Sequence, residues 1–385
     1  MNLLNLVAFV AFATTLATRA TDPVMLQIAS TFDVTPATAA LLASAFALPY
    51  AAVQPVLGPL ADMVSKTRLM TVCLSLLVLS SAAAMLAVNF PMLMAMRALA
   101  GIAAGGIFPI ALALVGDRFP VETRQVAIGR LLAAAMMGNL LGASGAGVLG
   151  DLFGWRSVFA VNAGIGLLVF VMALSGFRRI ADAAPGRFDL SSVVPNYRAI
   201  FRKPQAKYCF GIVFVEAMLV FGLFPHVANL LAGDGEGRAA IAGIVIAGFG
   251  IGAILYTVTV STLLRYVAGH RLMLAGGLMM GLSFLVTALR LPWPYEFANF
   301  LLLGFGMYFL HGYIQVVVTE LVPAARGSAL AVHSAAFFFG QAVGPLIYGW
   351  GFAAAGVGPT LLTVAAILAS AGFVASVTLR RAAGD

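Results

Sequence analysis

The stretch GNLLGASGAG at residues 138–147 returns at residues 340–349 as GQAVGPLIYG, and both copies fit the pattern G-x-x-x-G-x-x-x-x-G. The copies are separated by a shift of 202 residues, and the same shift carries Pro23 to Pro225 and Arg124 to Arg326. A repeat with a period of about half the chain indicates two copies of one structural unit. We therefore expect two halves of similar fold, each with a proline in its first helix and a glycine-lined fifth helix.

The composition shows that lipid, and not water, surrounds most of this chain. Of its 385 residues, 62% are hydrophobic and 9% are charged, and the mean hydropathy is +1.03. Soluble domains carry about 25% charged residues, and a helix of about 20 apolar residues crosses the hydrocarbon core of a bilayer. These values exclude secreted, cytosolic and nucleic-acid-binding proteins, and they predict roughly a dozen transmembrane helices.

Twelve apolar runs have the length of a transmembrane helix. They lie at residues 4–30, 36–61, 68–89, 92–116, 124–149, 155–177, 208–231, 238–263, 270–291, 294–321, 327–350 and 357–379. The longest polar connector, residues 178–207, divides them six and six. The predicted fold is an all-α integral membrane protein of twelve transmembrane helices in two pseudo-symmetric six-helix bundles. We expect domains at residues 1–177 and 208–385, joined by a central loop at residues 178–207.

The basic residues predict the orientation of these helices. Of the 22 lysines and arginines, 16 fall on the side of the central loop, 3 on the opposite side and 3 within the spans. Cytoplasmic loops of membrane proteins are enriched in basic residues. Both termini and the central loop are therefore expected in the cytoplasm. The net charge of +8 then reflects topology, so it gives no reason to expect a nucleic-acid partner.

Several familiar chemistries are missing from the sequence. Its two cysteines, Cys73 and Cys209, lie in or beside apolar runs, so no disulfide framework is expected. There is no G-x-x-x-x-G-K-[ST] phosphate loop, no H-E-x-x-H and no paired C-x-x-C. We expect no cofactor, no metal and no use of ATP. An enzyme is not expected either, because no nucleophile, base and orienting group occur as a set.

Two motifs resemble those of the major facilitator superfamily. The loop GPLADMVSKTR, residues 58–68, is similar to the signature G-x-x-x-D-R-x-G-R-[RK], and RALAGIAAGG, residues 97–106, is similar to the R-x-x-x-G motif of the fourth helix. The residues that match the loop signature are Gly58, Asp62, Lys66 and Arg68. Met63 and Ser65 depart from it, and Ala143 stands where the glycine motif of the antiporters has a proline. The likeness covers essentially the whole chain and extends to the bacterial drug and metabolite exporters of this superfamily.

This resemblance implies a transporter that works by alternating access around a cavity between its two bundles. It also implies that Gly58, Asp62, Lys66 and Arg68 form a cytoplasmic gate that holds one of the two states. The alternative is that these charges serve only membrane topology. The substitution of Met63 for the usual arginine leaves the charge network of the family incomplete.

Charged residues inside the spans are the first candidates for function, because a charge at the bilayer centre costs at least about 2.5–3.5 kcal/mol on insertion scales. Arg19 and Asp22 share one face of the first span, and their depth matches that of Arg97 in the fourth. Asp22 is a candidate proton carrier, with Arg19 and Arg97 as charge partners or substrate contacts. The alternative is an ion-paired packing element. Many antiporters of the superfamily have an acid four residues before the proline of the first helix, and here that residue is Arg19.

The second half offers further candidates. Glu216 lies eight residues into its span without a basic residue nearby in sequence, and it is either a second proton carrier or a hydrogen-bonding group between helices. His311, Tyr308 and Gln315 share a helix face and form either a substrate-binding or a packing stripe. In the second span, Gln54 either faces the cavity or bonds across helices. Glu296 and Glu320 lie at the two ends of the span 294–321, where we expect the membrane interfaces.

These observations predict a secondary transporter, and the resemblance favours proton-coupled efflux of small organic or amphipathic compounds. The expected partners are a small-molecule substrate, protons and the lipid bilayer, and a monomer is expected. A proton- or solute-coupled importer or a uniporter is the alternative within transport. A membrane sensor or scaffold that transports nothing is the alternative of another class. The resemblance also implies that the chain lies in a bacterial inner membrane.

Overall fold

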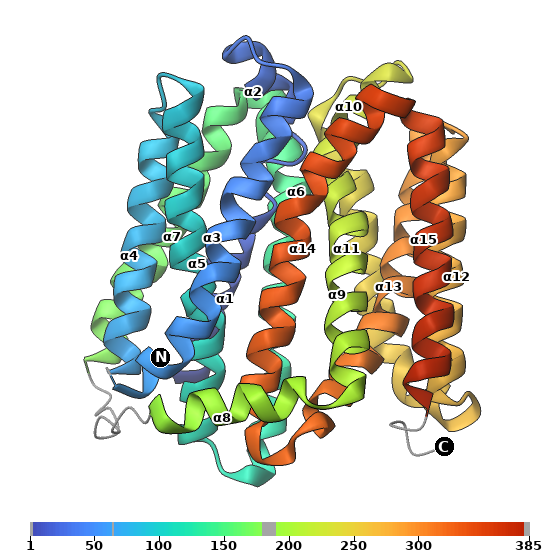
Figure 1. Ribbon diagram of the computed structural model, residues 1–385. Coiled ribbons are helices and arrows are strands. Elements are labelled where there is room, and N and C mark those ends of the chain that lie inside the picture. Colours follow the sequence, from blue (N-terminus) through green and yellow to red (C-terminus); the bar gives the residue numbers. More distant parts are fainter. Residues whose placement is uncertain (1–2, 64, 179–189, 381–385) are drawn as a thin grey trace. The chain divides into compact units, whose positions relative to one another are not determined.

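In the computed structural model, the described residues are 3–63, 65–178 and 190–380, and they are almost entirely helical (Figure 1). Within these ranges the side chains of residues 56–63, 121–123, 125, 190–194 and 324 are not described. The chain divides into two compact units, unit 1 at Met1–Phe188 and unit 2 at Asp189–Asp385. Each unit is a bundle of long helices, and no strand occurs among the described residues.

Unit 1 contains α1 (Leu3–Thr18), α2 (Met25–Thr31), α3 (Pro36–Met63), α4 (Lys66–Met85), α5 (Phe90–Arg118), α6 (Val121–Phe153) and α7 (Trp155–Phe177). Unit 2 contains α8 (Leu190–Phe201), α9 (Pro204–Leu223), α10 (Val227–Gly233), α11 (Ala239–Tyr266), α12 (Gly269–Ala288), α13 (Trp293–Leu321), α14 (Arg326–Ala355) and α15 (Val357–Thr378). Two short 3-10 helices, η1 (Phe224–His226) and η2 (Pro323–Ala325), complete it.

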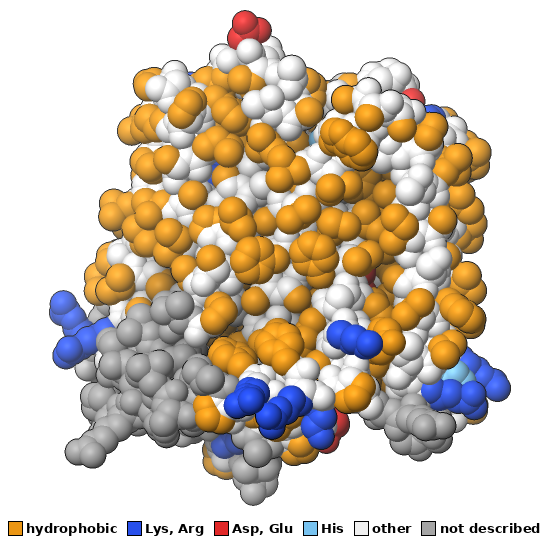
Figure 2. Space-filling model, in the orientation of Figure 1, with side chains coloured by type: hydrophobic (Ala, Val, Ile, Leu, Met, Phe, Trp, Pro, Cys, Tyr) orange, Lys and Arg blue, Asp and Glu red, His pale blue; other side chains and the backbone are white. Residues whose placement is uncertain are grey.

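Among the described residues, eleven helices are long and apolar enough to cross a membrane, counting α9 to α10 as one. The remaining predicted span, residues 4–30, is formed by α1, which is a shorter apolar helix, together with α2. Figure 2 shows hydrophobic side chains across the middle of the visible face of both units, and Lys and Arg side chains gathered over α8. Such a distribution is what a bilayer selects, because helices satisfy their own backbone groups and present apolar side chains to lipid. The predicted all-α membrane fold is confirmed.

The first predicted span is not one continuous helix, contrary to the prediction of an unbroken run over residues 4–30. α1 ends at Thr18, a turn follows, and α2 begins at Met25. Pro23 explains the break, because proline lacks a backbone N–H and disfavours a helical conformation in the residue before it. The equivalent Pro225 causes a milder interruption, since α9 passes through η1 directly into α10.

The internal repeat is visible in the packing of the helices. In unit 1, α1 packs on α6, α3 on α5 and α4 on α7, and in unit 2 the same pairs recur as α9 on α14, α11 on α13 and α12 on α15 (Figure 1). A Cβ at Gly142 would collide with the carbonyl oxygen of Leu16, and a Cβ at Gly344 would collide with that of Met218. Leu16 and Met218 are themselves 202 residues apart. The glycine motif therefore marks the same close helix contact in both units.

The contact between α3 and α5 recurs as the contact between α11 and α13, with a slightly different shift in residue number. A Cβ at Gly101 would collide with the carbonyl of Phe46, and a Cβ at Gly304 with that of Phe249. Here the equivalent residues are 203 apart. Positions can thus be compared between the units helix by helix.

We expect Gly142→Val to destabilise unit 1, because the new side chain would force α1 and α6 apart. Overpacking of this kind costs roughly 1–3 kcal/mol in the free energy of unfolding. Gly145→Val is the matched control, since it makes the same change in the same helix at a position where a Cβ has no neighbour within 4 Å. Thermal unfolding of both purified variants should show a lower Tm for Gly142→Val only. Equal Tm values for the two variants would contradict the close contact.

Candidate functional site

Unit 1 brings together the three charged residues that the sequence places at one depth. Arg19 and Asp22 lie in the turn between α1 and α2, with Arg19 Nη1 3.5 Å from Asp22 Oδ2, and Arg97 projects from α5. Asp22 is 1% exposed and Arg97 is 2% exposed. Both guanidinium groups attract the Asp22 carboxylate. The cluster therefore places one carboxylate between two cations in the interior of the unit.

Arg97 also has a structural partner that the sequence did not reveal. Its Nη1 donates to the carbonyl of Ala17 at 2.9 Å, and its Nη2 donates to that of Thr18 at 3.3 Å. These carbonyls are free because the helix stops after Thr18, and carbonyls at a helix end need an outside donor when buried. Its guanidinium lies 4.5 Å from the centre of the Phe46 ring. Arg97 therefore stabilises the broken helix as well as the Asp22 carboxylate.

The equivalent place in unit 2 is apolar. Phe221 and Phe224 correspond to Arg19 and Asp22, and Phe300 corresponds to Arg97. The Phe224 ring lies 5.1 Å from the Phe221 ring and 5.8 Å from the Phe300 ring, measured between centroids. The carbonyl of Leu219, equivalent to that of Ala17, accepts a hydrogen bond from the Tyr348 hydroxyl at 2.7 Å. One fold thus accepts either a charged or an aromatic cluster at this position.

A small recess of about 230 Å³ adjoins Arg97 in unit 1. Ser80, Ser81 and Asn162 give it a polar wall, and Phe159 and Ala100 line it elsewhere. Arg97 Nε has no hydrogen-bond partner among the described residues. Arg97 therefore retains a donor, and part of its surroundings is polar.

Unit 2 has its own polar cluster, formed by three helices. Glu216 on α9 is fully buried, and its Oε1 lies 2.5 Å from Nδ1 of His311 on α13. The ring of His333, on α14, lies 4.9 Å from the His311 ring. Neither Glu216 Oε2 nor His333 Nε2 has a hydrogen-bond partner among the described residues. The cluster therefore combines one carboxyl with two imidazoles, which are the side chains that exchange protons most readily near neutral pH.

The three groups lie at successive depths in unit 2. Glu216 is 12 residues from the start of α9, His311 is 10 from the end of α13, and His333 is 7 from the start of α14. At 1.5 Å per residue these positions are about 18, 15 and 10 Å from those helix ends, which lie on the same side as α8. The order Glu216, His311, His333 leads from the middle of the bundle toward that side. Among the described residues, no group of three His, Cys, Asp or Glu side chains is arranged to hold a metal.

His333 did not appear among the sequence candidates, although a signal for it exists. It stands in the run LAVHSAAF, six residues into the predicted span 327–350. A histidine inside a transmembrane segment is by default a candidate for function. The same criterion that selected Glu216 and His311 would therefore have selected His333.

Of the other residues predicted to contact substrate, only Tyr308 lies near the Glu216–His311 pair. Tyr308 lies near His311, with ring centroids 6.1 Å apart, and contacts Tyr256 at 5.9 Å. Gln315 is exposed and does not join them. Gln54 is buried, and its Nε2 donates to the carbonyl of Gly105 at 2.9 Å, which is a contact between α3 and α5.

The loop with the family signature is partly described. Lys66 Nζ lies 2.6 Å from Oδ2 of Asp117, at the end of α5. Ser65, which replaces the usual glycine, caps α4 by accepting a hydrogen bond from the backbone N–H of Arg68 at 3.1 Å. The side chain of Asp62 and the surroundings of Gly58 lie outside the described residues. The Lys66–Asp117 ion pair thus joins α4 to α5 at this end of unit 1.

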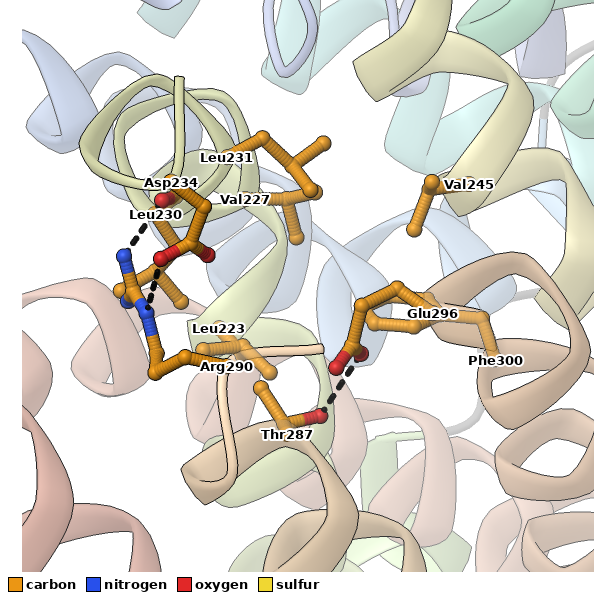
Figure 3. A pocket seen from close by; sticks show the side chains of 10 residues that line it. All are labelled: Leu223, Val227, Leu230, Leu231, Asp234, Val245, Thr287, Arg290, Glu296 and Phe300. Atoms are coloured by element: carbon orange, nitrogen blue, oxygen red, sulfur yellow. Dashed lines mark hydrogen bonds and ion pairs between the residues drawn. The ribbon is translucent and has the colours of Figure 1, made fainter. Parts of the chain in front are cut away.

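The two glutamates at the ends of α13 differ from one another. Glu320 is exposed, as expected for an interface, and pairs with Arg326 at 3.0 Å. Glu296 was expected at the opposite interface, but it is only 5% exposed and hydrogen-bonds Thr287 and Asn299. Glu296 lies in the first turn of α13, so its place at the opposite interface stays a prediction, but its side chain faces the protein and not water (Figure 3).

Comparisons with known proteins agree with this architecture. The family model described as Major Facilitator Superfamily matches residues 7–264. The chain is 26% identical over 370 residues to YwfA, an uncharacterised MFS-type transporter of Bacillus subtilis, covering 92% of this chain and 86% of YwfA. It is 35% identical over 133 residues to the multidrug resistance protein Stp of Mycobacterium tuberculosis, covering 34% of this chain and 25% of Stp. The crystal structure of a D-xylose–proton symporter superposes with a TM-score of 0.76 at 15% identity, covering 96% of each chain.

Proposed function

The chain belongs to the major facilitator superfamily of membrane transporters, and from this premise we propose that it exports small organic or amphipathic compounds in exchange for protons. In this proposal the Glu216–His311 pair is the proton site. Transport proceeds by alternating access, with the termini in the cytoplasm and the chain in a bacterial inner membrane as a monomer. The distribution of basic residues supports this orientation.

The observation that carries the proposal is the isolation of Glu216. Its side chain is fully buried, and its one hydrogen-bond partner among the described residues is His311. With one proton between them, the carboxyl and imidazole form a pair of zero net charge. Loss of that proton leaves a buried negative charge, which costs several kcal/mol unless a cation or water compensates for it. A substrate that carries positive charge or hydrogen-bond donors can compensate for it, so proton and substrate would occupy the site alternately.

The cluster in unit 1 supports a second role in coupling. Asp22 with Arg19 and Arg97 carries a net positive charge as long as the carboxylate is ionised, and arginine does not lose its proton in proteins. Asp22 is therefore the one member of the trio whose charge can change. Protonation of Asp22 would release both guanidinium groups from its carboxylate. Pairing of the carboxylate with a group of the substrate would do the same. The alternative remains that the trio is a packing element.

Two features support export of amphipathic compounds. Stp is named as a multidrug resistance protein. The chain also contains 28 phenylalanines and 16 methionines, and such side chains form apolar walls that adapt to different ligands. Sugars, by contrast, would need many fixed hydrogen-bonding groups.

Transport in proteoliposomes tests the exchange directly. With a lipophilic dye cation such as ethidium outside, exchange with protons predicts uptake when the lumen is acidic, because protons leave as the dye enters. Symport predicts uptake under the opposite gradient. A uniporter would show counterflow that neither gradient drives. The sign of the effective gradient does not depend on how the protein is inserted, so uptake into alkaline vesicles would contradict the proposal.

A further inference from the structure

The short helix α8, at the start of unit 2, takes no part in the proposed transport site. It packs on α9 and α14, and Figure 1 shows it lying crosswise to both of them. It leads directly into α9, the first part of the membrane span Pro204–Gly233. A helix that lies crosswise to a membrane span, at the end of that span, runs along the membrane surface. α8 therefore lies at the level of the lipid headgroups.

The sequence of α8 is amphipathic. Its apolar residues follow one another at intervals of three or four, which places them on one side of the helix: Leu190, Val193, Val194, Tyr197, Ile200 and Phe201. At the end of α8 whose side chains are described, the protein covers only part of this side. Ile200 is fully buried, whereas Phe201 is 62% exposed. The apolar side of α8 thus leaves a large aromatic ring for a second apolar partner.

The depth of the Phe201 ring indicates what that partner is. Its centroid lies 5.8 Å from that of Phe210, a buried residue of α9. Phe210 is six residues from the start of α9, or about 9 Å into a membrane-spanning helix. Amphipathic helices at a membrane surface bury their apolar side about 5–10 Å into the boundary between headgroups and acyl chains. Phe201 has the depth of such an anchor, so its exposed face meets acyl chains.

Exposed basic residues lie beside this ring. Arg198 and Arg202 are four residues apart and share one side of α8, and Lys203 follows in the turn before α9. All three are exposed, and no ion pair to any of them occurs among the described residues. From Leu190 to Val215 the sequence contains four basic residues and no acidic one. This segment therefore attracts an anion, and membrane topology alone does not require its charges to flank an exposed aromatic side chain.

We propose that α8 binds an anionic phospholipid, with the phosphate on Arg198 and Arg202 and an acyl chain against Phe201. Arginine suits this role because its guanidinium donates two parallel N–H bonds to a phosphate. Each basic residue close to an anionic membrane surface strengthens binding about fivefold. The site is separate from the proton site, since Glu216 lies about 18 Å from the start of α9.

Fluorescence quenching in bilayers measures lipid binding at this position. In the full-length Phe201→Trp variant, the added indole reports on the lipid beside it once the fluorescence of the wild type, which has three tryptophans, is subtracted. The bilayers are phosphatidylcholine with a fixed fraction of brominated phosphatidylglycerol or brominated phosphatidylcholine. Bromine quenches only nearby indoles, so the ratio of the two quenching constants gives the preference for the anionic lipid. We expect a preference of at least about tenfold, and a ratio near one would overturn the proposal.

Two double variants of the Phe201→Trp protein locate the charges responsible. Arg198→Gln with Arg202→Gln should lower the preference at least about fivefold. Arg265→Gln with Arg271→Gln is the matched control, because these arginines are exposed at the same end of unit 2 but on α11 and α12. This control should keep the full preference. An equal fall in both double variants would assign the effect to the general charge of that end and refute the site.

Two further measurements on the Phe201→Trp protein need no other substitution. Raising the salt concentration to about 1 M should lower the preference, because salt screens exposed charges, and a preference that salt does not change would contradict binding through the arginines. Inorganic phosphate, added at constant ionic strength, should not relieve the quenching by brominated phosphatidylglycerol. Relief of the quenching would show that the arginines bind free phosphate and that the assignment of a lipid is wrong.

Discussion

Glu216→Gln is expected to abolish proton-driven transport and to leave the protein folded. Glutamine has nearly the same shape as glutamate and can still hydrogen-bond His311, but it cannot take up or release a proton. If Glu216 and His311 together hold the coupled proton, the variant resembles the protonated state permanently. Substrate would then bind more weakly, because the site has no negative charge for it to compensate, and any substrate that crosses would do so without exchange for a proton.

Two assays in proteoliposomes separate these effects. Uptake driven by an acidic lumen should fall to the level of empty vesicles. Counterflow at equal pH on both sides should be reduced by the weaker binding of substrate but should persist above the level of empty vesicles, because this step moves substrate without net proton movement. Such a split between driven transport and exchange distinguishes a coupling residue from a residue needed for folding.

Glu320→Gln is the control for this experiment. Glu320 is on the same helix as His311, but it is exposed and pairs with Arg326. Exposed ion pairs contribute about 1 kcal/mol or less, so this variant should retain both activities. Driven uptake that persists in Glu216→Gln at the rate of Glu320→Gln would show that the coupled proton is carried elsewhere, with Asp22 as the next candidate.

His333→Gln tests the order of the groups within the same experiment. The His333 ring contacts the His311 ring. Among the described residues, His333 makes no hydrogen bond to Glu216. If it passes protons between His311 and the side of α8, its loss should slow driven uptake without abolishing it. A variant with unchanged rates would limit the proton site to Glu216 and His311.

The sequence predicted those parts of the structure that depend on local pattern. Hydropathy located the spans, and the repeated glycines identified α6 and α14 as equivalent helices. The structure then showed that these glycines contact α1 and α9, since a Cβ cannot fit at Gly142 or Gly344. Counting residues along helices also predicted that Arg19, Asp22 and Arg97 share one depth, and the structure brings them together although Arg19 and Asp22 lie in the turn after α1. These predictions need only the geometry of single helices.

Contacts between distant helices did not follow from the sequence. Glu216 and His311 are 95 residues apart, and nothing in either segment names the other as its partner. Glu296 is buried and accepts a hydrogen bond from Thr287 on α12, which is a tertiary contact. The break after Thr18 could have been inferred from Pro23, but the role of Arg97 in satisfying the freed carbonyls could not. Sequence pattern thus located the charges, and packing determined their partners.

The second large effect is expected from replacing the charged cluster of unit 1 by its aromatic counterpart from unit 2. The changes are Arg19→Phe, Asp22→Phe and Arg97→Phe, after Phe221, Phe224 and Phe300. Ala146→Tyr supplies the hydroxyl that Tyr348 provides to the carbonyl of Leu219 in unit 2. Unit 2 packs aromatic side chains at all four equivalent positions, and apolar residues often replace buried ion clusters without loss of stability where the site accommodates their volume. The fourfold variant should therefore insert and unfold near the wild-type Tm.

Asp22→Asn alone should behave differently, because it leaves the two guanidinium groups without their counter-charge. Removing one partner of a buried ion pair costs about 3–5 kcal/mol, so the Tm should fall although the protein still inserts. If Asp22 takes part in coupling, proton-driven uptake should be lost in both variants, and in the fourfold variant the loss cannot be attributed to instability. A stable fourfold variant that still accumulates dye in acidic vesicles at the wild-type rate would show that the trio only packs the helices. Loss of driven uptake at full stability would instead mean that unit 1 retains its buried charges for transport, since the same fold does without them in unit 2.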